Sequence, residues 1–145
     1  MSFDFLGGNM KKLFDDILSG IVLFIFIFTA EFFIMFLIED PALLANNQMA
    51  LIDLEFLLIS LPAGILSFIL AICLKTTTLP DILQKGVVWA GEIACFYLAI
   101  GLLNNTTARI FGTFGIYLTL ALIFVGPLFA GMLKSRRRAP LTAKE

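Results

Sequence analysis

The sequence predicts an all-α, polytopic membrane protein in which four transmembrane helices form one bundle. Of its 145 residues, 60% are hydrophobic and only 14% are charged, whereas soluble domains have close to one half and one quarter. The hydrophobic residues gather in four long runs, each near the roughly 20 residues that a helix needs to cross a bilayer. No linker separates two domains, so we expect a single integral membrane domain over residues 1–145.

The first span is expected over residues 17–38. Its sixteen Leu, Ile, Val and Phe residues outweigh its single acid, Glu31, by several kcal/mol on the insertion scale. This helix should therefore insert without help and face lipid broadly. It is longer than the roughly 7–15 apolar residues of a cleavable signal peptide, so we expect it to stay in the membrane.

The second span is expected over residues 54–74. Asp53 and Glu55 stand at its mouth and, together with Glu39 and Asp40, are interpreted as a solvated acidic rim. Small residues at helical spacing form a stripe along this span, and such stripes let membrane helices approach closely. The residues of this expected packing stripe are Ser60, Gly64, Ser67 and Ala71.

The third span, expected over residues 87–103, is the least apolar of the four. Its eight Leu, Ile, Val and Phe residues only just offset the cost of Glu92 on the insertion scale, so other helices should hold it in place. A second stripe of small residues recurs every four positions and is expected to pack against a neighbouring helix. This stripe consists of Gly91, Cys95 and Ala99.

The fourth span is expected over residues 110–133 and contains no charged residue. A basic cluster follows it directly, made up of Lys134, Arg136, Arg137 and Arg138. Such a cluster stops the chain at the membrane surface and attracts anionic lipids. It is interpreted as a lipid anchor, with the docking of a cytoplasmic partner as the alternative.

The basic residues predict the orientation of the chain. Nine of them fall on one side of a four-span arrangement: Lys11, Lys12, Lys75, Lys85, Lys134, Arg136, Arg137, Arg138 and Lys144. Only Arg109 falls on the other side. The positive-inside rule then places both termini in the cytoplasm of a cell-membrane protein. The pI of about 5.4 and the lack of a broad basic face argue against a nucleic-acid partner.

Two acids lie within the expected spans, Glu31 in the first and Glu92 in the third. Their depths differ by roughly 13 Å, so they should not form one carboxylate pair. Each is interpreted as structurally paired, Glu31 with Arg109 and Glu92 with Lys75 or Lys85, or as a proton-titrating group of a transporter. Hydrogen bonds across the bundle would serve equally, and the candidates are Ser60, Ser67, Thr29 and Tyr97.

The pairs Ala30-Glu31 in the first span and Trp89-Ala90 in the third give the chain a similarity to small multidrug-type exporters with four short helices. This similarity implies proton-coupled export by a homo-oligomer. The chain departs from that pattern in its greater length, in its second acid and in a charge bias that opposes insertion in two orientations.

The layout of the chain from Leu13 to Arg137 also resembles that of small four-helix bacterial membrane proteins encoded beside LytTR-type transcription regulators. The similarity lies in the segment Leu79-Pro80-Asp81-Ile82-Leu83-Gln84-Lys85, which runs into a short third helix, and in a long fourth helix with a basic end. In that group, the implied role is to restrain a cytoplasmic regulator at the membrane. The connector between the second and third spans, residues 75–86, and the basic tail would then be the docking surfaces.

These patterns favour a non-enzymatic regulatory or accessory subunit of the membrane. The sequence has no His and none of the common hydrolase or metalloprotease motifs, so we expect no catalytic residue, metal or cofactor. The expected partners are the lipid bilayer and another membrane or cytoplasmic protein, or a second copy of the chain. The alternative is a small proton-coupled transporter acting through Glu31 or Glu92.

Overall fold

The computed structural model describes residues 3–38, 48–74 and 78–138, and in these ranges the chain is helical and contains no strand. Four of the helices are long, and the fifth is a single turn. In chain order they are α1 (Phe3–Ile38), α3 (Gln48–Cys73), α4 (Leu79–Leu103), α5 (Thr107–Ile110) and α6 (Phe114–Arg138). The predicted all-α fold is therefore confirmed.

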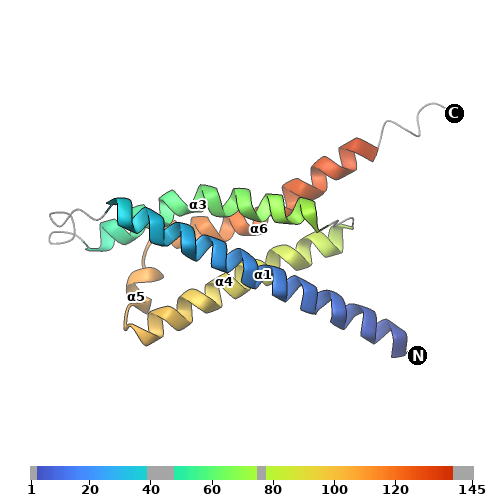
Figure 1. Cartoon of the computed structure of the whole chain (residues 1–145), viewed down its shortest axis with the longest axis horizontal. Helices are drawn as coiled ribbons and strands as arrows, with labels where there is room; N and C mark the ends of the chain where they lie inside the picture. Colours follow the sequence, from blue (N-terminus) through green and yellow to red (C-terminus); the bar gives the residue numbers. More distant parts are fainter. Residues whose placement is uncertain (1–2, 39–47, 75–77, 139–145) are drawn as a thin grey trace.

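The four long helices are long and apolar enough to cross a membrane. The apolar stretches are Met10–Leu37, Met49–Cys73, Leu79–Leu103 and Phe114–Lys134. Helices α3 and α6 form the most extensive pair, and α4 packs against α6 (Figure 1). Helix α1 crosses the bundle obliquely and contacts both α3 and α4. Most of its surface remains exposed, as the sequence predicts for the first span.

All four long helices begin at other residues than the sequence predicts. Helix α1 begins at Phe3 rather than at 17, and α3 begins at Gln48 rather than at 54. Helix α4 begins at Leu79 rather than at 87, because Thr78 caps it and Pro80 and Asp81 suit a first turn. Helix α6 begins at Phe114 rather than at 110, since the preceding turn forms the separate helix α5. Residues 79–86 and the expected third span are thus one continuous helix, which brings polar residues of the segment 79–86 against α1.

The core of the bundle lies on one face of α4. Trp89 and Ile93 are fully buried there, and Tyr97 continues the same face one turn further on. These side chains meet apolar residues from the other three long helices, namely Leu23, Ile27, Phe56, Ile59, Ala63, Ile116 and Ile123. Because Lys85 stands four residues before Trp89, it lies on the same buried face.

Small residues hold α3 and α6 close together. Ser60, Ser67 and Ala71 are buried, and Ser67 donates a hydrogen bond of 2.7 Å to the carbonyl oxygen of Ile123. A Cβ atom on Gly64 would lie 3.1 Å from the Cβ of Leu122 on α6. The stripe singled out from the sequence of the second span thus lies in the contact between these two helices.

Gly115 of α6 provides a direct test of this close packing. A Cβ atom there would lie 2.6 Å from the Cβ of Phe56 and 2.8 Å from the carbonyl oxygen of Asp53, both on α3. We expect Gly115→Ala to lower the free energy of unfolding by about 1–3 kcal/mol, because the overpacked helices must separate. The measurement is detergent-induced unfolding of the purified protein.

Gly91→Ala is the matched control, since a Cβ added at Gly91 meets no other side chain or helix of the described residues within 4 Å. Alanine has the higher helix propensity, so this variant should match the wild type or gain up to about 1 kcal/mol. Equal effects of the two substitutions would show that the contact between α3 and α6 is looser than described.

Candidate functional site

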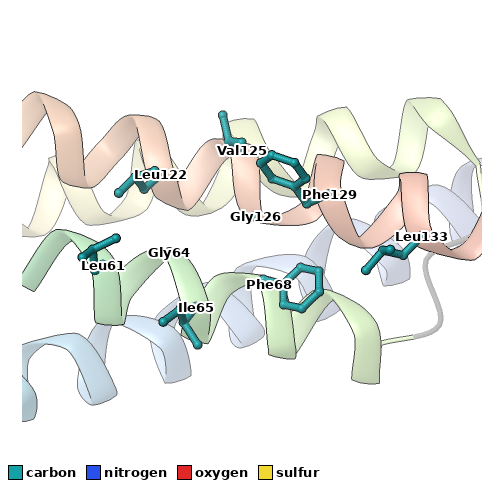
Figure 2. A pocket seen from close by; sticks show the side chains of 9 residues that line it. All are labelled: Leu61, Gly64, Ile65, Phe68, Leu122, Val125, Gly126, Phe129 and Leu133. Atoms are coloured by element: carbon teal, nitrogen blue, oxygen red, sulfur yellow. The ribbon is translucent and has the colours of Figure 1, made fainter.

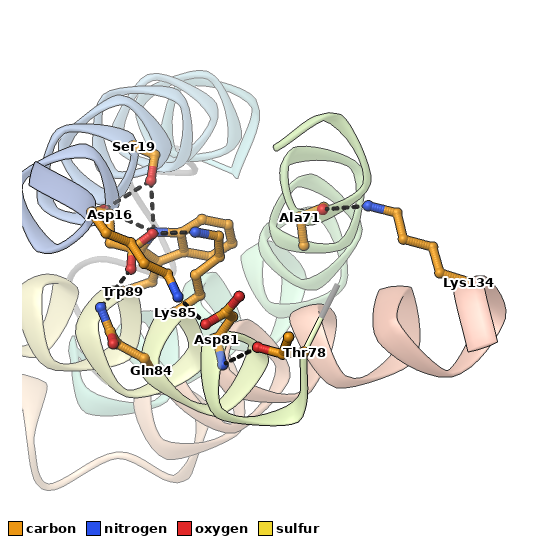
Figure 3. Close-up of polar contacts among 10 residues, drawn as sticks. Asp16, Ser19, Ala71, Thr78, Asp81, Gln84, Lys85, Trp89 and Lys134 are labelled. Atoms are coloured by element: carbon orange, nitrogen blue, oxygen red, sulfur yellow. Dashed lines mark hydrogen bonds and ion pairs between the residues drawn. The ribbon is translucent and has the colours of Figure 1, made fainter. Parts of the chain in front are cut away.

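A buried polar cluster joins α1 to α4, and we call it the Asp16 cluster (Figure 3). Its members are Asp16, Ser19, Gln84, Lys85 and Trp89. Asp16 is only 1% exposed and forms an ion pair with Lys85. Its second carboxylate oxygen accepts a 2.8 Å hydrogen bond from the side-chain amide of Gln84. Both oxygens of the buried carboxylate are therefore paired, which offsets the cost of burying the charge.

Trp89 extends this cluster towards the core of the bundle. Its indole N–H donates to the carbonyl oxygen of Asp16 and to the hydroxyl oxygen of Ser19, each at 3.0 Å. The Ser19 hydroxyl in turn donates to the Asp16 carbonyl oxygen at 2.8 Å. The cluster thus couples the largest core side chain to α1 and fixes how α1 lies on α4.

Glu92 lies beside this cluster but does not join it. Its predicted pairing with Lys85 is wrong, because Lys85 forms its ion pair with Asp16. Lys75, the other predicted partner, lies outside the described residues. One carboxylate oxygen of Glu92 is buried and hydrogen-bonds to no described residue. A methyl group on Gly20 would overlap this carboxylate, so the glycine provides its space.

Other basic side chains at this end of the bundle are also engaged within the chain. Lys12 forms an ion pair with Asp81 at the start of α4. Lys134 donates hydrogen bonds to the carbonyl oxygens of Ala71, at 3.4 Å, and Ile72, at 3.0 Å, in the last turn of α3 (Figure 3). We call this end of the bundle, marked by Lys12, Lys85 and Lys134, the basic end. The side chains of Arg136, Arg137 and Arg138 lie outside the described residues.

A second polar cluster, formed by Glu31, Glu55 and Tyr97, lies further from the basic end, and we call it the Glu31 cluster. The Tyr97 hydroxyl donates a 2.5 Å hydrogen bond to Glu31. The carboxyl group of Glu55, from α3, lies close enough to that of Glu31 to interact with it. The cluster therefore joins α1, α3 and α4.

The structure corrects two predictions at this cluster. Glu55 was expected in a solvated rim, but it is only 7% exposed, and one of its carboxyl oxygens has no hydrogen-bond partner among the described residues. Glu31 was assigned Arg109 as its partner, but it accepts from Tyr97, one of the hydrogen-bonding alternatives. Arg109 lies on α5 and is exposed. Asp53 is half-buried, and its side chain accepts a 2.7 Å hydrogen bond from the amide of Gly115 at the start of α6.

Aromatic rings surround the Glu31 cluster. Phe56 meets the Tyr97 ring edge to face at a centroid distance of 5.2 Å, and Phe24 does so at 6.0 Å. Phe24 also stacks on Phe96 at 4.2 Å. These rings give the side chain of Tyr97 an apolar environment.

The small-residue stripe of α4 faces outward. Gly91, Cys95 and Ala99 are exposed, on the side of the helix away from Trp89 and Ile93. The packing predicted from this stripe is therefore wrong for contacts within the chain. The reason is that the larger Trp89, Ile93 and Tyr97 take the buried face, and a helix cannot bury both faces in a bundle of this size.

Sequence reasoning missed Asp16 and Glu55 as site residues. Asp16 lies just before the first span expected over residues 17–38, yet α1 continues through it as a helix. One signal was available, since Lys85, Trp89, Ile93 and Tyr97 recur every four residues and so share one helix face. That spacing indicates that Lys85 is buried, but it does not identify the acid that it meets.

Among the described residues, no group of three metal-ligating side chains is close enough together to hold an ion. Comparison with known protein families, with curated proteins and with solved structures finds no match for this chain.

Proposed function

We propose that the chain is a non-enzymatic regulatory or accessory subunit that binds a transmembrane helix of a partner protein within the bilayer. The observation that carries this proposal is the outward position of Gly91, Cys95 and Ala99 on α4. Small residues let two membrane helices approach closely, whereas they offer lipid chains little surface to contact. A partner helix packed on this face would therefore make closer contacts than lipid chains do.

The chemistry of the partner helix follows from Glu92, which is half-buried at the edge of the same face. One of its carboxylate oxygens has no hydrogen-bond partner among the described residues. A polar group at membrane depth gains from a donor, because no water competes for it there. The partner helix should therefore combine small residues with a hydrogen-bond donor at the depth of Glu92.

The use of the lysines supports a partner within the membrane over one at its surface. Lys85 is buried against Asp16, so it is not available as a docking residue on the connector. Lys12 and Lys134 also each bind an acceptor on a neighbouring helix of the chain. The orientation with cytoplasmic termini in a bacterial cell membrane remains part of this proposal, and it rests on the excess of Lys and Arg at the basic end.

Co-purification tests this function. The protein is purified from its native membrane in mild detergent, and its companions are identified by mass spectrometry. We expect a stoichiometric membrane protein with the wild type and at least about a tenfold loss of it in Ala99→Leu, because a bulky side chain blocks close helix approach. Ala121→Leu, at an exposed alanine of α6, is the matched control and should retain the partner.

Equal recovery of the partner with both variants would exclude the α4 face as its binding site. A chain that comes alone, as a homo-oligomer, would contradict the accessory role and favour the second candidate function.

That second candidate is a small proton-coupled transporter, and the neighbouring acids Glu31 and Glu55 favour it specifically. Ionisable residues at membrane depth are commonly proton carriers. Glu92, with its unpartnered oxygen, could take part in the same path.

A further inference from the structure

An apolar groove of about 360 Å³ runs along the contact between α3 and α6 (Figure 2). Its lining consists of carbon-rich side chains and two glycines: Leu61, Gly64, Ile65, Phe68, Leu122, Val125, Gly126, Phe129 and Leu133. The side chains of Leu61, Ile65 and Phe129 are more than half exposed, so the groove is open to the surroundings of the bundle. At membrane depth those surroundings are lipid chains.

The two glycines account for the shape of the groove. A Cβ atom on Gly126 would lie 2.9 Å from the backbone nitrogen of Phe68, and one on Gly64 would lie 3.1 Å from the Cβ of Leu122. The helices therefore nearly touch at the base, while larger side chains stand up on either side. An unfilled groove of this kind would leave its walls without dispersion contacts, so a flexible apolar chain fits it well.

The groove ends next to a positive charge. Leu133 lines its end, and the following residue, Lys134, places its ammonium group against the last turn of α3. Two hydrogen bonds to Ala71 and Ile72 leave the ammonium group one further N–H, and in the described part of the chain no acid forms an ion pair with Lys134. A phosphate group at this position would meet both a free donor and an opposite charge.

We propose that the groove between α3 and α6 binds one acyl chain of an anionic phospholipid, whose phosphate group contacts Lys134. The acyl chain lies between Leu61 and Leu133 and covers the two glycines. The site is separate from the outward face of α4, so it does not depend on the proposed partner. The bound lipid acts as an additional element of the α3–α6 contact.

Fluorescence quenching in reconstituted vesicles tests this site. Phe129→Trp places an indole on the wall of the groove, and the natural Trp89 gives a constant background because it is fully buried. The quenchers are phosphatidylglycerol or phosphatidylcholine with brominated acyl chains, each at a low mole fraction in unlabelled phosphatidylcholine. Leu83→Trp is the matched control, since Leu83 is exposed about one turn from the basic end of α4.

We expect brominated phosphatidylglycerol to quench the Phe129→Trp protein several-fold more strongly than brominated phosphatidylcholine does. The Leu83→Trp protein should show equal quenching by the two lipids. Adding Lys134→Gln to Phe129→Trp should remove the preference, and Lys134→Arg should retain it. Equal quenching by both lipids in the Phe129→Trp protein, or a preference that survives Lys134→Gln, would overturn the proposal.

Discussion

Replacing Lys85 with methionine should lower the free energy of unfolding by about 3–5 kcal/mol, because Asp16 would then remain as an uncompensated charge in the contact between α1 and α4. Both side chains are buried, with 8% and 1% of their surface exposed for Lys85 and Asp16. Asp16→Leu should cost a similar amount, since it leaves the ammonium group of Lys85 alone. The fluorescence of the buried Trp89, which hydrogen-bonds to Ser19 of the same cluster, reports the unfolding in mixed detergent micelles.

The double variant measures how much Asp16 and Lys85 stabilise each other. Asp16→Leu combined with Lys85→Met should lose clearly less stability than the sum of the single variants, because no unpaired charge remains. Lys12→Met is the control: the Lys12–Asp81 pair is 36% and 23% exposed, and such pairs contribute about 0–1 kcal/mol. Additive effects in the double variant would mean that Asp16 and Lys85 do not stabilise each other.

Glu31→Gln and Glu55→Gln should each lower the amount of protonated carboxyl group in the Glu31 cluster while preserving the fold. Removing one of two neighbouring acids removes the repulsion between their charged forms, so the remaining acid can ionise. In infrared spectra at pH 7, the carbonyl stretch of a protonated carboxyl group should be present in the wild type and weaker in each variant. Asp53→Asn should leave this band unchanged, because Asp53 accepts from the Gly115 amide.

The same variants decide whether the cluster serves transport. The protein is reconstituted in vesicles with an entrapped pH dye, and proton movement is followed after a lipophilic cation is added outside. If the chain is a proton-coupled transporter, Glu31→Gln, Glu55→Gln and Glu92→Gln should each reduce the signal to that of empty vesicles. Wild-type proton movement in all three variants, or none in the wild-type protein, would reject the transporter function.

The two stripes of small residues show where sequence reasoning stops. Ser60, Gly64, Ser67 and Ala71 pack against α6, whereas Gly91, Cys95 and Ala99 face outward, although both sets have helical spacing. A stripe indicates a face that can approach another helix closely. Whether this face packs inside the bundle depends on where the larger side chains of the same helix lie. In α4, Trp89 and its neighbours occupy the buried face, so the stripe lies on the outside.

The sequence by itself determined the all-α fold and its four apolar helices, since a chain in a bilayer must satisfy its backbone hydrogen bonds within each span. Only the tertiary structure decided which ionisable groups meet. Asp16 and Lys85 are 69 residues apart in the sequence, and Glu31 meets Glu55 from a different helix. These pairings depend on how far each helix is rotated and shifted along its neighbour. The hydrophobic pattern of a mostly apolar helix does not specify either quantity, because nearly every face can be buried in protein or lipid.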